Sequence, residues 1–206
     1  MVHQKGLVLV ISGPSGTGKG SIIKPYMKEN PLCRYSVSIT TRKPRSEDKN
    51  GITYHFKAKE EVEELIRDDG LLEWDSYCGN YYGTPSKFVY DSIAEGYDCI
   101  LELTVPGALN IRKKIPECVM IFIAPPSIDE LQRRIVGRGT EDPHTIEKRM
   151  SKSMNELEMI KHYDYVIVNR DVNVAISELS AIVQAEKVKY ERSREVLNEL
   201  GLIQEE

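Results

Sequence analysis

The chain has 206 residues, of which 40% are hydrophobic and 29% charged, and this composition excludes extended disorder. The length suits one well-buried core with insertions, since two independent domains would fit only tightly. The formal net charge of -4 excludes a general attraction for polyanions, so we expect no nucleic-acid partner, and basic residues that act on phosphate must act locally.

No segment of the sequence is an apolar run long enough to cross a membrane. The run before Ser12 and Gly13 is also too short for the apolar part of a signal peptide. The four cysteines are scattered and contain no C-x-x-C pair, a pattern typical of reduced thiols. We therefore expect a cytoplasmic protein without a membrane partner.

Strands and helices are predicted to alternate along much of the chain. Continuous β-branched and leucine runs predict strands that are buried on both faces, at residues 6–12, 99–105, 118–124 and 164–169. Apolar residues at helical spacing predict helices at 107–115, 127–137 and 172–200. This alternation predicts the α/β class, with a parallel sheet covered by helices on both faces. The charged tail after about Ala185 is interpreted as a solvated helix with a frayed end.

Two parts of the chain interrupt this pattern. Residues 36–96 combine short strand-like pieces, polar turns and one helix at 58–70, which predicts a small mixed insertion. Residues 138–156 begin with a polar segment that contains glycine and arginine, and they predict a mobile lid. The core would then consist of residues 1–35, 97–137 and 157–206.

A phosphate-binding loop is predicted between the first strand and the helix that follows it. The pattern G-x-x-x-x-G-K is made by Gly13, Pro14, Ser15, Gly16, Thr17, Gly18 and Lys19. The glycines let successive backbone N–H groups point at phosphate oxygens, and the helix N-terminus adds positive partial charge. Lys19 would reach the β and γ phosphates of ATP. A ligand-free turn is the simpler interpretation, but the full motif in this context disfavours it.

The loop departs from the usual motif at its last position. A serine or threonine hydroxyl normally follows the lysine and binds magnesium, but here Gly20 takes that position and Ser21 comes after it. One explanation is an inactive site. The other is a nucleoside-monophosphate kinase, in which magnesium is held mainly by phosphates and water and needs no protein ligand.

The insertion contains a second group of residues suited to phosphate. Ser38, Arg42 and Arg45 lie close together in the sequence, and two planar guanidinium groups so placed suit the capture of one phosphate. Tyr54 and Tyr82 could add hydroxyl donors. Each tyrosine taken alone is more often a half-buried aromatic on a strand.

These segments together resemble the guanylate kinases. The resemblance rests on "ISGPSGTGKGS", "SVSITTRKPR", "NGITYHF", "LLEWDSYCGNYYGTP", "IFIAPPS", "RRIVGRGTE", "IEKRM" and "HYDYVIVN", which together span most of residues 7–190. It implies a P-loop nucleoside-monophosphate kinase fold with a GMP-binding insertion and a lid. The implied activity is transfer of the γ-phosphate of ATP to GMP with Mg²⁺, in purine nucleotide metabolism.

The resemblance also implies a role for individual residues. The GMP phosphate would be held by Arg42, Arg45, Tyr54 and Tyr82. The guanine site would be lined by Ser38, Glu73 and Thr84, and Glu102 would also belong to the GMP-binding residues. A carboxylate suits guanine because N1–H and the exocyclic amine are adjacent donors, and one bidentate contact of this kind contributes about 1 to 3 kcal/mol of discrimination.

ATP would be bound by the phosphate loop, from Gly13 to Ser21 and including Gly20, and by Arg138 and Asn169. The catalytic charges would be Lys19, Arg42, Arg134, Arg138 and Arg149. Phosphoryl transfer requires positioning and positive charge and no nucleophilic side chain.

The sequence departs from the family pattern after the insertion, where the family reads L-E-I-D-x-Q-G. Glu102 is present, but Thr104 replaces the second acid and Pro106 the glutamine. Arg170 replaces an acid after Asn169, and Asp48 replaces a glutamate. The change at Thr104 has three explanations: a slower site, a rearranged site in which Glu102 contributes more, or a shifted acceptor. The first two are favoured because the other site residues are all present.

Other functions remain as alternatives. A kinase for another phosphorylated acceptor is disfavoured by Ser38 and Glu73. Related non-catalytic binding modules commonly lack a working phosphate loop, so Lys19 disfavours that interpretation. No N-K-x-D motif supports a GTPase.

Overall fold

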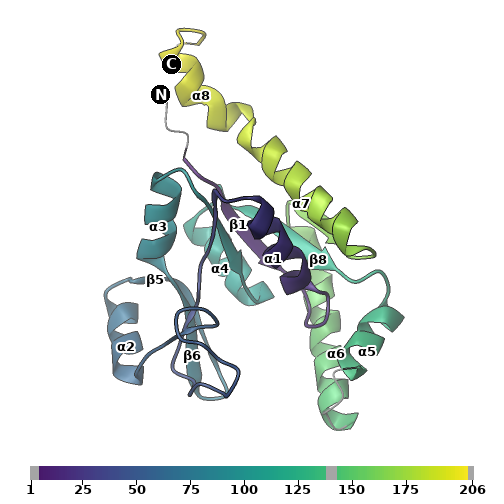
Figure 1. The fold of residues 1–206 in the computed structure, drawn as a ribbon. Helices are drawn as coiled ribbons and strands as arrows, with labels where there is room; N and C mark the ends of the chain where they lie inside the picture. Colours follow the sequence, from purple (N-terminus) through teal and green to yellow (C-terminus); the bar gives the residue numbers. More distant parts are fainter. Residues whose placement is uncertain (1–4, 138–142, 204–206) are drawn as a thin grey trace.

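The computed structural model describes residues 5–137 and 143–203. In this part of the chain, five parallel strands form the larger sheet, in the order β2-β7-β1-β8-β9. Figure 1 shows two neighbouring strands of it, β1 and β8. These strands are β1 (Val8–Ser12), β2 (Cys33–Tyr35), β7 (Asp98–Glu102), β8 (Val119–Ala124) and β9 (Tyr165–Val168). The predicted α/β class and parallel sheet are confirmed, and β2 is a strand of this sheet that the sequence analysis did not place there.

Helices cover both faces of this sheet because the strands are apolar on both faces. Leu9 and Ile11 of β1 pack with Ile22 and Leu179, which come from α1 (Lys19–Glu29) and α7 (Val172–Lys187). The alternate residues of the same strand pack on the other face against α4 (Val105–Lys114) and α3 (Ser86–Ala94). Successive side chains of a strand point to opposite faces, so one continuous apolar run serves both layers.

The smaller sheet is mixed and carries most of the insertion. Its order is β4-β3-β6-β5, and β3 pairs parallel with β4 but antiparallel with β6. Its strands are β3 (Ile39–Thr40), β4 (His55–Phe56), β5 (Leu71–Tyr77) and β6 (Asn80–Pro85). Helix α2 (Lys59–Arg67) packs Val62 against Ile39 and Leu71 of this sheet.

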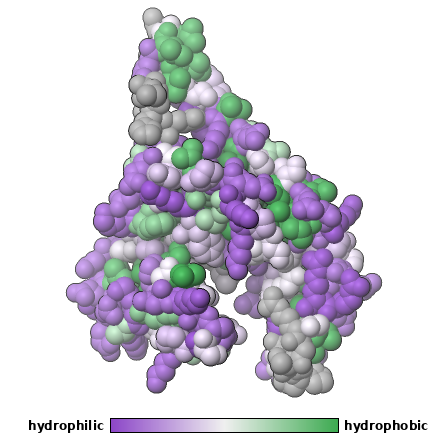
Figure 2. Space-filling model, in the orientation of Figure 1, coloured by the Kyte–Doolittle hydropathy of each residue, from purple (hydrophilic) through white to green (hydrophobic). Residues whose placement is uncertain are grey.

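The predicted lid is largely helical in the part that is described. Residues 138–142 lie outside the described residues, and α6 (Pro143–Glu158) then leads into the short helix η1 (Met159–His162). Helix α5 (Ile128–Val136) precedes this region and begins at the Ser127 cap, whose Oγ accepts from the Glu130 N–H at 3.1 Å. The space-filling view shows a cleft between the insertion and α5 and α6 (Figure 2).

The C-terminal prediction needs correction. The apolar pattern over 172–200 is two helices, α7 and α8 (Tyr190–Glu199), which are separated at Val188 and Lys189. The tail is also not solvated throughout, because Glu186 is only 2% exposed. Its carboxylate accepts from Tyr165 Oη and pairs with Lys189, which gives this acid a structural role at the end of α7. No described helix has the length and hydropathy that a membrane span requires.

Candidate active site

The phosphate loop joins the end of β1 to the start of α1, as the motif predicts. Lys19 Nζ donates to the carbonyl oxygens of Gly13 at 2.7 Å and Pro14 at 3.3 Å, so the ammonium group closes over the loop. Gly18 has φ 87°, in the left-handed region, and a Cβ there would lie 2.5 Å from Asn169 Nδ2. Glycine at this position is therefore required both by the backbone and by the close approach of Asn169.

Asn169 supports the loop from the end of β9. Its Nδ2 donates to the Thr17 carbonyl at 2.7 Å, and the residue is only 3% exposed. Arg134 of α5 lies beside it, with Nη2 donating to the Asn169 carbonyl at 3.4 Å and Nε donating to Glu130 Oε1 at 2.7 Å. The structure thus brings Arg134 and Asn169 to the phosphate loop, together with a neighbouring acid that orients the arginine.

Helix α6 contacts the same loop through one of its faces. Arg149 Nη2 donates to Ser15 Oγ at 2.7 Å, and Ser153, one turn later, is buried. The pKa of Glu156, a further turn along, is raised by burial, while the positive charges of Lys152 and Lys19 oppose the rise. Residues at i, i+4 and i+7 share a helix face, so this face presents a cation and then a carboxylate to the loop. Arg138, the other predicted lid arginine, lies outside the described residues.

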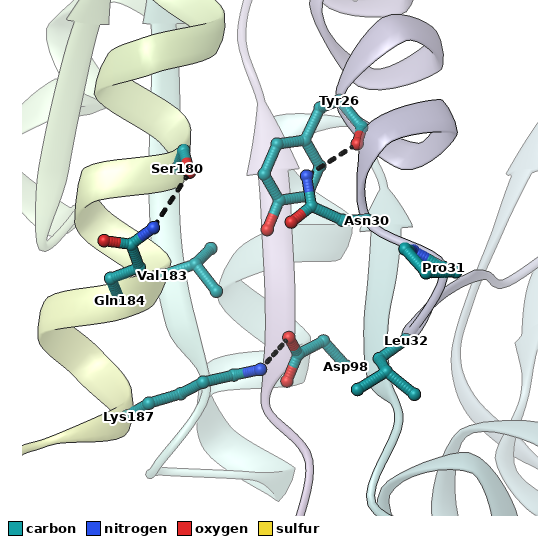
Figure 3. Close-up of a pocket in the computed structure, with 9 residues that line it drawn as sticks. All are labelled: Tyr26, Asn30, Pro31, Leu32, Asp98, Ser180, Val183, Gln184 and Lys187. Atoms are coloured by element: carbon teal, nitrogen blue, oxygen red, sulfur yellow. Dashed lines mark hydrogen bonds and ion pairs between the residues drawn. The ribbon is translucent and has the colours of Figure 1, made fainter.

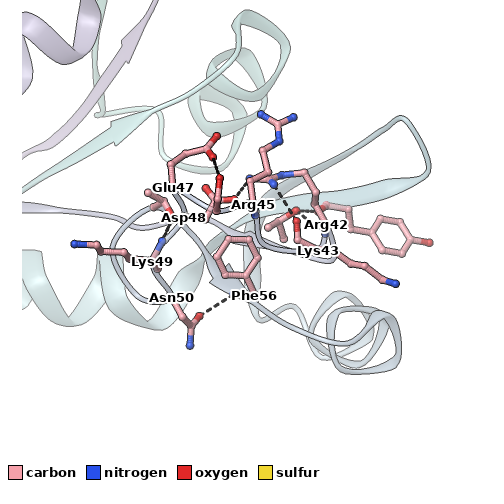
Figure 4. Close-up of polar contacts among 12 residues, drawn as sticks. Arg42, Lys43, Arg45, Glu47, Asp48, Lys49, Asn50 and Phe56 are labelled. Atoms are coloured by element: carbon pink, nitrogen blue, oxygen red, sulfur yellow. Dashed lines mark hydrogen bonds and ion pairs between the residues drawn. The ribbon is translucent and has the colours of Figure 1, made fainter.

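The insertion gathers residues suited to a phosphate around Arg42 (Figure 4). Arg42 Nη2 donates to Asp48 Oδ2 at 2.8 Å, and its guanidinium carbon lies 5.5 Å from the ring centroid of Tyr54. The rings of Tyr54 and Tyr82 meet edge to face, with centroids 5.8 Å apart. The Arg45 N–H also donates to Asp48 Oδ2 at 2.8 Å, and this bond, with that of Arg42, lowers the pKa of the Asp48 carboxyl. The carboxylate thus fixes the arginine in place.

Arg45 contributes to this group mainly through its backbone. The residue is exposed at the end of the turn, whereas Arg42 and Tyr54 are half-buried. The structure therefore brings Arg42, Tyr54 and Tyr82 together and leaves the Arg45 side chain at the rim. Ser38 is half-buried just before β3, where its carbonyl accepts from the His55 N–H at 2.8 Å.

A half-buried carboxylate stands at the start of the hairpin formed by β5 and β6. Glu73 pairs across the hairpin with Thr84, whose Oγ1 donates to Glu73 Oε1 at 2.6 Å. Burial raises the pKa of Glu73, and the hydrogen bond from Thr84 opposes this rise. Glu102 ends β7, and its Oε2 accepts from Tyr35 Oη at 3.3 Å. Glu73 and Thr84 are therefore in direct contact, and Glu102 is held by a tyrosine of β2.

Thr104 has a structural role that its place in the sequence pattern did not reveal. It is the N-cap of α4, and its Oγ1 accepts from the Gly107 N–H at 3.3 Å. Pro106 lies in the first turn, where a missing N–H costs nothing. The strand predicted over 99–105 therefore ends at Glu102, since residues from Val105 onward are helical. The threonine hydroxyl thus meets the capping requirement that an aspartate would also satisfy.

The phosphate loop has no hydroxyl at the position where the usual motif places a magnesium ligand. Gly20 has no hydroxyl, although a Cβ there would meet none of the described atoms within 4 Å. Within residues 5–137 and 143–203, no three His, Cys, Asp or Glu side chains are grouped so that they could hold a metal. Magnesium commonly keeps several waters and binds through phosphates and few protein groups, which is compatible with these residues.

A separate pocket of about 190 Å³ lies between the end of α1 and α7 (Figure 3). Buried Asp98 in its wall accepts from the Leu7 N–H at 3.0 Å and pairs with Lys187 at 2.6 Å. The carboxylate is thus satisfied by groups that tie β1, β7 and α7 together, and its role is structural.

Comparison with known proteins agrees with this geometry. Residues 5–186 match the family model described as guanylate kinase. The guanylate kinase of Halalkalibacterium halodurans is 48% identical over 200 residues, which cover 97% of this chain and 98% of the relative. That of Desulfitobacterium hafniense is 45% identical over 192 residues, covering 93% and 96%. The crystal structure of guanylate kinase from Anaplasma phagocytophilum superposes with a TM-score of 0.76 at 31% identity, covering 98% of each chain.

Proposed function

The chain belongs to the guanylate kinase family, and from this membership we propose that it transfers the γ-phosphate of ATP to GMP and releases ADP and GDP. The observation that carries the proposal is the Glu73 carboxylate, held by Thr84 in the insertion of a chain whose core has a complete phosphate loop. One environment suits a triphosphate and the other a base with two adjacent donors.

On the donor side, we propose that the phosphate loop and Lys19 bind the phosphates of ATP. When phosphate enters, Lys19 would exchange the carbonyl oxygens of Gly13 and Pro14 for the β and γ phosphate oxygens. Arg149 already reaches the loop at Ser15, so its charge would lie on the γ-phosphate side. Arg134 and Arg138 would add charge there, and Asn169 would face the adenine.

On the acceptor side, Arg42, Tyr54 and Tyr82 would bind the GMP phosphate, with Arg45 closing from the rim. Ser38, Glu73 and Thr84 would bind the guanine, and Glu102 would complete the GMP site. Since burial disfavours the Glu73 charge, the two donors of guanine would supply hydrogen bonds that favour the ionised form. A base that lacks these donors would leave the carboxylate poorly compensated.

The reaction is an in-line transfer between the two sides. A phosphate oxygen of GMP forms a bond to the γ-phosphorus as the bond from that phosphorus to the bridging β–γ oxygen breaks, and ADP leaves. Lys19 and the arginines stabilise the charge on the transferred group, and no side chain forms a covalent bond. Mg²⁺ bound to the ATP phosphates and water would neutralise charge on those phosphates.

The division of labour follows the architecture. Residues 1–35, 97–137 and 157–206 would form the ATP-binding core, residues 36–96 the GMP-binding insertion and residues 138–156 the lid. Closure of the insertion and the lid over the cleft would exclude water, which competes with GMP as an acceptor. The enzyme would serve purine nucleotide metabolism in the cytoplasm.

A product assay tests the proposal. The protein is incubated with ATP, GMP and Mg²⁺, and the nucleotides are separated by chromatography. ADP and GDP should appear in equal amounts, and a chelator should stop the reaction. ADP without GDP would indicate hydrolysis, and ATP binding without any product would indicate a non-catalytic module; either result contradicts the proposal.

A further inference from the structure

Helix α4 approaches the proposed guanine site so closely that a side chain at its contact point would require a neighbouring group to shift. Gly107, in the first turn of α4, is buried, and a Cβ there would lie 3.0 Å from Glu73 Oε2 and 3.4 Å from Glu73 Cδ. A contact of 3.0 Å is too short for carbon and oxygen without a shift of a few tenths of an ångström. The carboxylate of Glu73 therefore rests against the bare backbone of α4.

An irregularity in β5 holds the two elements together. Leu71 pairs with Pro85 across the hairpin, but Glu73 pairs with Thr84, so Leu72 is an extra residue between two regular pairs. A bulge of this kind changes the direction of the neighbouring side chains. Leu72 is 2% exposed and belongs to the same core cluster as Val105 of α4. The bulge thus anchors β5 on α4 and fixes the approach of Glu73.

The first turn of α4 is itself held in place by Thr104. Its Oγ1 accepts from the Gly107 N–H and would lie 3.4 Å from a Cβ on Gly107. The N-terminal turn of a helix carries positive partial charge, which favours a nearby carboxylate. Thr84 fixes Oε1 from one side and α4 confines Oε2 from the other, so both oxygens of Glu73 have a defined position.

We propose that Gly107 is a positioning residue for base selectivity: its lack of a side chain lets Glu73 settle against α4 with both oxygens placed for a base that presents two adjacent donors. This inference rests on the proposed function of Glu73. It also gives Thr104 a part in the site, as the cap that holds the turn on which the carboxylate rests.

The test compares GMP with IMP, which has N1–H but lacks the exocyclic amine. We expect Gly107→Ala to raise KM for GMP about tenfold, which lies within the roughly 5- to 150-fold that losing a whole bidentate contact costs, and to lower the GMP to IMP ratio of kcat/KM by a similar factor. KM for ATP and kcat at saturating GMP should change less than about twofold. Asn110→Ala, at an exposed position of the same helix, should change none of these values.

A double-mutant cycle with Glu73→Ala separates positioning from damage to the fold. Once Glu73 is truncated there is no carboxylate to displace, so Gly107→Ala should cost less than about twofold in that background. Alanine also favours the helix over glycine, so the melting temperature of Gly107→Ala should not fall. A wild-type enzyme that uses GMP and IMP equally would overturn the role of Glu73 and this inference with it. Wild-type discrimination that survives Gly107→Ala unchanged, or an equal cost of Gly107→Ala in both backgrounds, would overturn the inference alone.

Discussion

Replacing Glu73 by glutamine changes the chemistry of the proposed guanine site while keeping its shape. Glutamine retains one oxygen, which can still accept from Thr84 Oγ1. The other carboxylate oxygen, which lies against Gly107, becomes an amide that donates. Because guanine presents two adjacent donors, this amide would face a donor, and one of the two hydrogen bonds is lost.

The expected size of the effect follows from that lost contact. A bidentate contact contributes about 1 to 3 kcal/mol of base discrimination, which corresponds to about 5- to 150-fold in binding. Steady-state kinetics at saturating ATP should show that Glu73→Gln raises KM for GMP within this range and brings kcat/KM for GMP closer to that for IMP. Unchanged preference for GMP over IMP would refute the assignment of Glu73 to the base.

The same substitution makes a prediction about stability and pH. The pKa of Glu73 in the folded protein is raised by burial above its ordinary value of 4.5. The folded state therefore binds this proton more tightly than the unfolded state, so the contribution of Glu73 to stability is greatest below about pH 4.5 and is lost as the pH rises through the folded pKa. The melting temperature of Glu73→Gln minus that of the wild type should increase from pH 4.5 to 7.5. A difference that does not change with pH would contradict the burial argument.

Substitutions at three further positions test other parts of the site. Lys19→Ala should lower kcat/KM at least about 100-fold, because it removes the positive charge that stabilises the transferred phosphate. The free energy of unfolding, measured by calorimetry, should change by less than about 1 kcal/mol. Activity within a few-fold of wild type would show that the loop lysine takes no part in the mechanism. Thr104→Val should lower the free energy of unfolding by about 1 kcal/mol, because it removes the α4 cap, and the melting temperature by roughly 2 to 4 °C. Thr104→Asp keeps a capping oxygen and should lower neither. Equal melting temperatures for the two variants would contradict the capping role. Asp48→Asn should raise KM for GMP about 2- to 10-fold, because Arg42 loses the carboxylate that orients it, and should leave KM for ATP unchanged. An equal rise in both KM values would contradict this role, because it would show that the substitution disturbs more of the structure than the Arg42 site.

The core and the phosphate loop could be predicted from the sequence because their signals are local. The apolar runs of β1 and β8 and the seven residues from Gly13 to Lys19 each carry their pattern within one short segment. Asn169 could be placed near the nucleotide only by resemblance. Its bond to the Thr17 carbonyl joins residues 152 positions apart, and only the strand order brings them together.

Thr104 shows why the site itself was harder to predict. Compared with the family pattern, the threonine looked like a lost acid at the end of a strand. In the structure it caps a helix, and a proline two residues later is a helix-start signal that the sequence analysis did not use. The predicted helix begins at Gly107, whereas α4 begins at Val105, so only the structure places this glycine inside a helix, where an isolated glycine often reflects close packing. Its neighbour Glu73, however, lies in β5 of the smaller sheet, and no sequence pattern predicts the contact between β5 and α4.

Glu156 was missed for a related reason. In the sequence it is one of several acids in the charged segment predicted to be the lid, and a run of charges is most often exposed to solvent. The structure half-buries it on the face of α6 that also carries Arg149, within reach of the charge of Lys19. Burial of this kind depends on where α6 packs, and the helical pattern alone does not specify that.

A comparison of acceptors shows whether the proposed site selects guanine. Turnover of ATP is followed by a coupled ADP assay with GMP, AMP, CMP and UMP in turn, at equal concentrations. The proposed site predicts that GMP supports the fastest transfer by a wide margin. Among the four bases only guanine presents both donors to Glu73, and the phosphate of GMP reaches Arg42 at the same time. Equal turnover with AMP, CMP or UMP would contradict the account.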